Sequence, residues 1–221
     1  MYSMARVIKK HKIKGERKIE RELLGILVFL AVLVVVFLIA SAYFRSLNYF
    51  EYNGLTFSKK KVGTIPLFHH SYYFKTQAGK LIQYNLYLRN DPRYNNVTLI
   101  GGPSHLLNAE SVAYLSINSD GLQSCRYGSL AVASISSFMS DNQMKVIAGN
   151  LDFWSAGSNR DKWVTCENQP GNRVVELLKG NETKVIIDKN CYKIEVADCQ
   201  ILEAVEKLEV QSIIGALKIK L

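Results

Sequence analysis

The sequence lacks the residue patterns that mark most enzyme families. It contains no G-x-S-x-G, no H-E-x-x-H, no phosphate-binding loop and no dinucleotide-binding fingerprint. No C-x-x-C pair occurs, so neither a zinc knuckle nor a thioredoxin-like redox site is indicated. Tandem repeats are absent too, and with 48% hydrophobic residues the chain is too apolar to be disordered. The sequence therefore predicts a folded, non-repetitive protein and indicates no activity for it.

Charged residues are missing from one long stretch near the N-terminus. Leu23 to Phe44 is a run of 22 residues without a single charge. A helix rises about 1.5 Å per residue, so the run can reach about 33 Å, close to the ~30 Å of a bilayer's hydrocarbon core. In lipid the backbone must satisfy its own hydrogen bonds, so we expect a helix despite the many valines. The stretch predicts a transmembrane helix, with Tyr43 in the headgroup layer.

The tail before this stretch is basic. Residues 1–22 hold eight Lys or Arg and three Glu, a net of +5 out of the chain's +9. The first fifteen or so residues beyond the stretch hold little basic charge besides Arg45 and Lys59. The positive-inside rule therefore places the N-terminus in the cytoplasm and the C-terminal bulk outside the cell membrane. This tail indicates contact with the lipid bilayer and not with nucleic acid.

The same stretch has two other interpretations. Ala40-Ser41-Ala42 matches a signal-peptidase site, and cleavage after Ala42 would release a secreted protein. The stretch is, however, longer than the ~7–15 apolar residues of a signal peptide, which favours an uncleaved signal anchor. Lys14-Gly15 followed by Glu20 is also compatible with an archaeal pilin-type leader, although Glu16-Arg17-Lys18 is charged where a pilin helix is apolar.

Cysteine usage agrees with an exterior location. All the cysteines follow the apolar stretch: Cys125, Cys166, Cys191 and Cys199. An even number in an extracytoplasmic domain predicts two disulfides, for which four cysteines allow three connectivities. Four reduced, buried thiols are the alternative.

The pairing can be narrowed from the expected strands. The segment after Cys191 alternates like a strand, which carries Cys199 beyond the ~7 Å Cα limit for a bond. Arg173–Leu178 and Thr183–Asp188 look like a hairpin turning through residues 180–181, whose open end brings residues 166 and 191 together. We therefore predict the pairs Cys166–Cys191 and Cys125–Cys199.

The remainder predicts an α/β (α+β) domain at residues 62–221, after a juxtamembrane connector at 45–61. Its architecture is expected to be two layers around a mixed sheet, with few helices. Expected strands are Ile65–Thr76, Leu81–Asn90, Glu110–Asn118, Met144–Ala148, three within Val174–Val196, and Ile213–Leu221. The first two are separated by residues 77–79, which indicates a hairpin, and the second alternates between apolar and polar residues. Expected helices are Cys125–Ser140 and an amphipathic one at Gln200–Glu209, whose polar face holds Glu203, Glu206 and Lys207. Asn96 and Asn181 begin N-glycosylation sequons near expected turns.

Few residues have side chains that suit catalysis, metal binding or ligand recognition. His69 and His70 are neighbours on a strand and point to opposite faces, so they cannot chelate one metal together. His70 shares its face with aromatic residues, which favours a packed histidine. Asp152 and Asp161 flank Trp154 and Trp163, a set that suits either a carbohydrate site or half-buried aromatics. We expect no catalytic residue, cofactor or metal.

Several short segments resemble uncharacterised single-pass membrane-anchored proteins of archaea. These are residues 50–57, 72–74, 87–93, 161–168 and 190–192, within a resemblance covering most of residues 50 to 210. The resemblance implies an archaeal cell envelope and a membrane anchor. It implies no activity and no functional residues.

The sequence thus predicts a membrane-anchored extracytoplasmic domain, a binding or structural module that recognises an envelope protein or a glycan. The alternative is an envelope hydrolase with a site around His70, His105 and Arg89. An enzyme would gather these groups in one concave pocket with perturbed pKa values.

Overall fold

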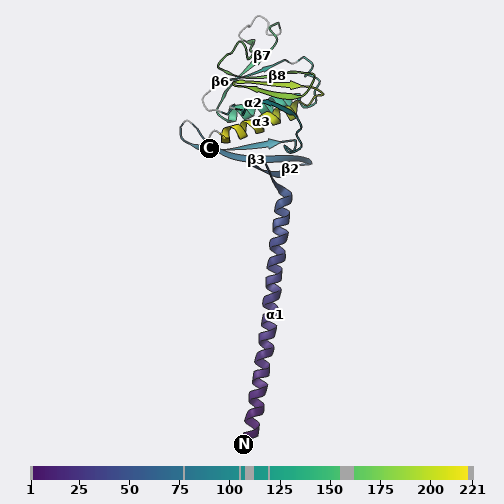
Figure 1. Ribbon diagram of the computed structural model, residues 1–221, viewed down its shortest axis with the longest axis vertical. Coiled ribbons are helices and arrows are strands. Elements are labelled where there is room, and N and C mark those ends of the chain that lie inside the picture. Colours follow the sequence, from purple (N-terminus) through teal and green to yellow (C-terminus); the bar gives the residue numbers. More distant parts are fainter. Residues whose placement is uncertain are drawn as a thin grey trace. The chain divides into compact units, whose positions relative to one another are not determined.

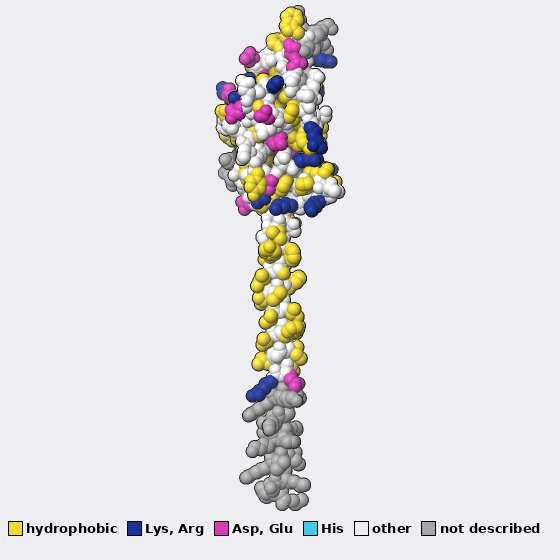
Figure 2. Space-filling view, turned by 90° about the vertical axis from the view of Figure 1, so that its right-hand side faces the viewer, with side chains coloured by type: hydrophobic (Ala, Val, Ile, Leu, Met, Phe, Trp, Pro, Cys, Tyr) yellow, Lys and Arg dark blue, Asp and Glu magenta, His cyan; other side chains and the backbone are white. Residues whose placement is uncertain are grey.

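The structure is a computed structural model that describes residues 2–76, 78–104, 106–107, 112–118, 120–154 and 162–218, with side chains from residue 21 to 217 of these ranges. The chain divides into two compact units, Met1–Tyr49 and Phe50–Leu221. The first unit is the helix α1 (Tyr2–Asn48). Its part Arg21–Asn48 has a mean hydropathy of 3.4 and is 0% buried in the protein. Figure 2 shows the apolar side chains along it. The predicted apolar N-terminal helix is confirmed, and it is long enough to cross a membrane.

From Tyr49 onward the chain forms strands with two helices between them. The strands are β1 (Tyr49–Tyr52), β2 (Leu55–Val62), β3 (Ile65–Lys75), β4 (Leu81–Leu88), β5 (Thr98–Gly101), β6 (Val112–Ile117), β7 (Lys145–Asn150), β8 (Arg173–Lys179), β9 (Lys184–Asp188) and β10 (Cys191–Val196). The helices are α2 (Gly128–Asp141) and α3 (Ile201–Lys218).

These strands make two sheets with the helices between them. β1-β2-β3-β4 form a four-stranded sheet of antiparallel hairpins, and β5-β9-β10-β8-β6-β7 form a six-stranded mixed sheet. Figure 1 shows α2 and α3 between β6–β8 on one side and β2–β3 on the other. The predicted α/β class, mixed sheet, few helices and two disulfides are confirmed. The antiparallel sheet adds a third layer on the far face of the helices.

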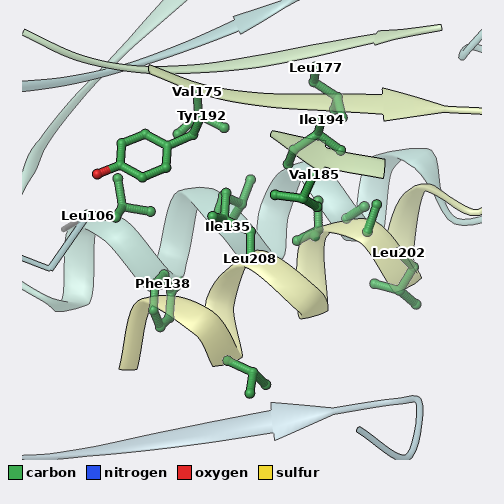
Figure 3. Packing of buried hydrophobic residues seen from close by; sticks show 14 of the residues in the cluster. Leu106, Ile135, Phe138, Val175, Leu177, Val185, Tyr192, Ile194, Leu202 and Leu208 are labelled. Carbon is green, nitrogen blue, oxygen red and sulfur yellow. The ribbon is translucent and has the colours of Figure 1, made fainter. Parts of the chain in front are cut away.

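The core lies between the mixed sheet and the helices. Val175 and Leu177 of β8 and Tyr192 and Ile194 of β10 face Ile135 of α2 in Figure 3. All five side chains are fully buried. On the other side of α2, the ring of Phe138 meets Tyr84 of β4 edge-on at 5.9 Å. One set of helices therefore fills the apolar faces of both sheets.

Three expectations about the elements were wrong. The residues expected as a connector, 45–61, form the end of α1 and the strands β1 and β2, because Leu55 and Phe57 bury their side chains in the hydrophobic core. The expected strand Ile213–Leu221 continues α3 as far as Lys218. Ile213 and Ile214 extend the apolar surface of that helix, and a helix between two sheets is buried on both faces, which blurs the pattern that separates helix from strand.

The third wrong expectation is the hairpin of β8 with β9. β10 lies between these two strands, parallel to β8 and antiparallel to β9. Short apolar strands look alike in sequence, so the order in which they pair is decided by the tertiary structure. The hairpin of β3 with β4, the strand at 112–117 and the helix at 128–141 are confirmed.

Candidate functional site

Both predicted disulfides are present. Cys125 and Cys199 have their Cα atoms 5.2 Å apart, and those of Cys166 and Cys191 are 5.5 Å apart. The geometry behind the second pair differs from the one expected. Cys191 begins β10 opposite Val174 at the start of β8, and that parallel pairing brings it beside Cys166.

The sulfur atoms of Cys166 and Cys191 lie near the carboxylate of Glu176, and the three groups could in principle surround a metal ion. Both sulfurs are bonded to each other, so neither is a free thiolate. Glu176 also has partners of its own: it accepts a hydrogen bond from the Cys166 backbone N–H at 2.8 Å and lies 3.4 Å from the Lys193 ammonium. The cluster is a structural support for the Cys166 loop.

His70 is a packed residue, as its position on the strand predicted. It is 8% exposed and lies between the rings of Phe57 and Tyr72, at 5.3 and 6.1 Å. Its Nδ1 donates to the Thr56 carbonyl at 2.9 Å, and burial lowers its pKa, which keeps the ring neutral. His69 points to the other face of the sheet, where Nε2 lies 2.9 Å from Asn85 Oδ1.

The other two residues of the hydrolase hypothesis, His105 and Arg89, are not seen to form a catalytic site with His70. His105 lies outside the described residues. The guanidinium of Arg89 lies 5.3 Å from the centre of the Tyr127 ring, and the Arg89 backbone N–H donates to Glu206. His70 is therefore a packed side chain, and the described contact of the Arg89 side chain is with Tyr127 at the start of α2.

The two tryptophans and Phe153 form an aromatic group of which only Trp154 is fully exposed among the described residues. Phe153 meets Trp154 and Trp163 edge-on, with ring centres 5.5 and 5.2 Å away, and Trp154 is 85% exposed. Asp152 accepts a hydrogen bond from the Trp154 backbone N–H and so shapes the turn. Asp161 lies outside the described residues, so the predicted pairing of two carboxylates with two tryptophans stays a prediction.

The two sequon asparagines line one polar pocket of about 580 Å³. Asn96 and Asn181 are both exposed there. The Thr183 hydroxyl has a separate structural use, because it bonds both the N–H and the C=O of Ala197 at 2.9 Å. Glycosylation of either asparagine stays a prediction.

A second, apolar crevice of about 420 Å³ lies at the carboxyl ends of parallel strands. Ile117 ends β6 and Leu177 lies near the end of β8. Gly128 and Val132 of the first turns of α2 complete its wall, with Ile201 at the start of α3. No charged side chain lines it in the part of the chain that the structure describes.

The position of this crevice follows from the order of the strands. β6 connects through α2 to β7 on one side, whereas β8 is followed by β9 and β10 on the other side. The chain connections therefore leave β6 and β8 in opposite directions, which makes this pair of strands a topological switch point. Open α/β sheets bind ligands outside the carboxyl ends of their strands at such a point. Periodicity alone cannot find this site, because it depends on which strands are neighbours.

The crevice is cross-linked at one side, and two arginines lie near the start of α2. Cys125, which lines it, is bonded to Cys199 just before α3, so the loops after β6 and β10 are held together. No side chain caps α2 at Tyr127, and the first turn has no acidic residue. The guanidinium groups of Arg89 and Arg126 both lie 5.3 Å from the Tyr127 ring. Helix N–H groups and two cations thus favour an anion here.

Two buried carboxyl groups on α3 were missed by the sequence analysis, which placed Glu206 on a solvent-facing side. Glu206 accepts hydrogen bonds from the backbone and side-chain N–H groups of Asn90, at 3.1 and 2.8 Å, and burial raises its pKa to about 7. Glu209 is 0% exposed, accepts from the Ser134 hydroxyl at 2.7 Å, and burial raises its pKa to about 8. Both fasten the helices to each other or to β4.

Comparison of the chain with protein-family models, with curated proteins and with solved structures found no match. The resemblance to archaeal membrane-anchored proteins therefore stays a prediction.

Proposed function

We propose that this chain is a single-pass membrane protein with a cytoplasmic N-terminus, and that its disulfide-bonded domain is an extracytoplasmic binding module of the cell envelope. The observation that carries a binding role is the crevice between β6, β8 and α2. Its volume of about 420 Å³ is within the ~300–1,000 Å³ of small-molecule sites. The archaeal origin implied by the resemblance belongs to the same proposal.

The membrane placement rests on α1 and on the cysteines. The large apolar side chains between Leu23 and Phe44 are exposed in the described chain, and a lipid bilayer would remove this apolar surface from water. Disulfides persist in oxidising compartments, and both lie on the C-terminal side of α1. The basic residues of the tail support a cytoplasmic N-terminus.

The lining of the crevice indicates the ligand's chemistry. Aliphatic walls favour an apolar body, and burying a sugar's hydroxyl groups there would cost free energy without matching hydrogen bonds. The uncapped start of α2 and the two arginines favour an anionic group at one end. We therefore propose a small, mainly apolar carboxylate as the ligand class.

Binding can be tested on the full chain in phosphatidylcholine nanodiscs by fluorine NMR, with 4-fluorobenzoate as the probe. The protein should broaden the probe signal, and Ala133→Trp should abolish the broadening, because Ala133 lines the crevice with an exposed side chain. Ser137→Trp, one turn further along α2 and also exposed, is the matched control. Equal broadening by both variants would reject the crevice as the site.

Membrane anchoring can be tested by the intact mass of the membrane-extracted protein. We expect the full-length mass, no alkylation before reduction and four alkylations after it. A mass that begins at Tyr43 would show cleavage after Ala42. Free thiols before reduction would contradict the oxidising exterior.

A further inference from the structure

The hairpin of β2 and β3 has an outer part that leaves the core. Leu55 and Phe57 at the start of β2 are 1% and 0% exposed, whereas all residues from Lys59 to Val62 are exposed. The same strands stay paired over this part, from Lys59 opposite Phe68 to Val62 opposite Ile65. We call residues 59–68 the basic arm.

The basic arm combines cations with an apolar tip. Lys59, Lys60 and Lys61 follow one another, and the turn at Gly63-Thr64 has Val62 and Ile65 on either side, 63% and 36% exposed. The exposure of two aliphatic side chains to water at a turn is unfavourable in free energy, whereas the ammonium groups of the neighbouring lysines are well solvated. This combination is typical of surfaces that rest at a membrane–water interface.

The charge of the surrounding sheet points to an anionic partner. Residues 52–90, which include β2, β3 and β4, contain six Lys or Arg and no Asp or Glu. Residues 94–221, which include the whole mixed sheet, contain 12 basic and 14 acidic residues. The positive charge of the second unit is therefore concentrated in the antiparallel sheet.

Few residues along the chain separate the basic arm from α1. α1 ends at Asn48 and β1 begins at Tyr49, with no residue between them. The turn at Asn53-Gly54, with φ of 50° and 80°, returns the chain along β1, and the rings of Phe50 and Phe57 stack at 5.5 Å. β2 then continues beyond the start of β1 for the four residues 59–62, about 13 Å of strand.

We propose that the basic arm rests in the headgroup layer of the bilayer that holds α1, with its lysines on anionic lipid phosphates and Val62 and Ile65 at the interface. This rests on the proposed anchoring of α1. The apolar run ends at Phe44, and four helical residues, about 6 Å, separate it from β1. An arm of about 13 Å is long enough to cover that distance. The occupant we commit to is therefore anionic lipid, supplied by the anchor's own membrane.

The test uses the full chain in nanodiscs of phosphatidylcholine, with or without 30% phosphatidylglycerol. Thr64→Cys at the exposed turn carries a nitrobenzoxadiazole label, and Lys145→Cys on the edge strand β7 carries the control label. A lipid with a spin label near its headgroup should quench the label at residue 64 at least twofold more than the label at residue 145. Equal quenching at both positions would overturn the proposal.

Two variants of the labelled protein separate charge from apolar contact. Lys59→Gln/Lys60→Gln/Lys61→Gln should reduce the quenching in anionic nanodiscs to its value in phosphatidylcholine alone. The control Lys145→Gln/Lys162→Gln/Lys189→Gln, which removes the same charge elsewhere and is read with the label at residue 64, should leave it unchanged. Val62→Asp should lower quenching in both lipids. If both triple variants behave alike, specific phosphate contact by the arm is rejected.

Failure of this proposal is distinguishable from failure of anchoring. Protein that is released from native membranes by alkaline carbonate is not anchored, and the proposed function then fails. Protein that resists carbonate, while its residue 64 label is quenched no more than the residue 145 label, is anchored but has no lipid-bound arm.

Discussion

The two sheets of the second unit are held together in different ways. The antiparallel sheet has its strands in chain order, β1-β2-β3-β4, so each strand pairs with the next. The mixed sheet has the order β5-β9-β10-β8-β6-β7, and apart from the β9–β10 hairpin its pairings join strands that are not consecutive in the chain or are separated by a helix. Both disulfides belong to the mixed sheet. One joins the loop after β6 to the loop after β10, and the other joins the loop before β8 to the start of β10. Covalent cross-links therefore occur where chain entropy opposes pairing most.

The largest expected effect tests this contrast directly. Cys125→Ser/Cys199→Ser removes a cross-link between residues 74 apart and should lower the free energy of unfolding by about 4 kcal/mol. Cys166→Ser/Cys191→Ser, over a separation of 25, should cost about 3 kcal/mol. Denaturant unfolding measures both.

Hydrogen exchange locates the loss. Amides of β6, β8 and β10 should exchange faster in the Cys125→Ser/Cys199→Ser variant, while those of β3 and β4 change less. Equal acceleration in both sheets would show that the sheets open as one cooperative unit.

The layer between the sheets should make stability depend on pH. The pKa of Glu209 is about 8 in the folded protein and about 4.5 as its ordinary value, so the folded state holds a proton that the unfolded state releases. Stability is therefore lost as pH rises from about 4.5 through about 8. Glu209→Gln should make this slope shallower without removing it, because Glu206, whose pKa burial raises to about 7, loses stability over part of the same range. The expected gain near pH 8 is about 1–3 kcal/mol. Thermal unfolding across this range measures it.

Glu182→Gln, at an exposed position, is the control for that pH series. It should keep the slope of the unmodified protein. An unchanged slope in Glu209→Gln would show that its carboxyl group is ionised in the fold.

A smaller effect is expected where the antiparallel sheet is bonded to α2. The Tyr72 hydroxyl donates to Asn142 Oδ1 at 2.6 Å, and Asn142 in turn donates to the Phe138 carbonyl at 2.8 Å. Tyr72→Phe should lower the free energy of unfolding by about 1 kcal/mol. Tyr73→Phe, on the exposed face of the same strand, is the matched control and should have almost no effect. Equal losses would contradict a role for the Asn142 bond.

The smallest effect is expected on the surface of the mixed sheet. Lys184 of β9 and Glu195 of β10 are register partners with a separation of 3.1 Å between Nζ and Oε2, and both side chains are partly exposed. A double-mutant cycle with Lys184→Ala and Glu195→Ala should give a coupling of about 0.5 kcal/mol that falls with added salt. A coupling independent of salt would indicate that packing dominates.

Local patterns in the sequence were sufficient for the features that depend on neighbours along the chain. The absence of charge from Leu23 to Phe44 predicted the apolar helix, and the alternation of residues 81–88 predicted a strand that pairs with β3. His70 was expected to be packed because its strand face is aromatic, and it is. The disulfide pairs were also predicted correctly, although for Cys166–Cys191 the geometry that produces the pair was different.

The candidate site could not be found in that way. Its walls come from β6, β8, α2 and α3, and the parallel pairing of β6 with β8 decides that these two strand ends lie together. The burial of Glu206 and Glu209 has the same origin, because a helix with polar residues on one side looks solvent-exposed until a second sheet covers that side.

The sequence by itself therefore determined the apolar helix, the cysteine pairs and the α/β character, since hydrophobic period, charge and turn residues act over a few residues. Only the tertiary structure decided the strand order, the third layer, the crevice and the protonation of the buried carboxyl groups. These features depend on contacts between residues far apart in the chain. Forming such contacts costs chain entropy, and no local sequence pattern specifies them.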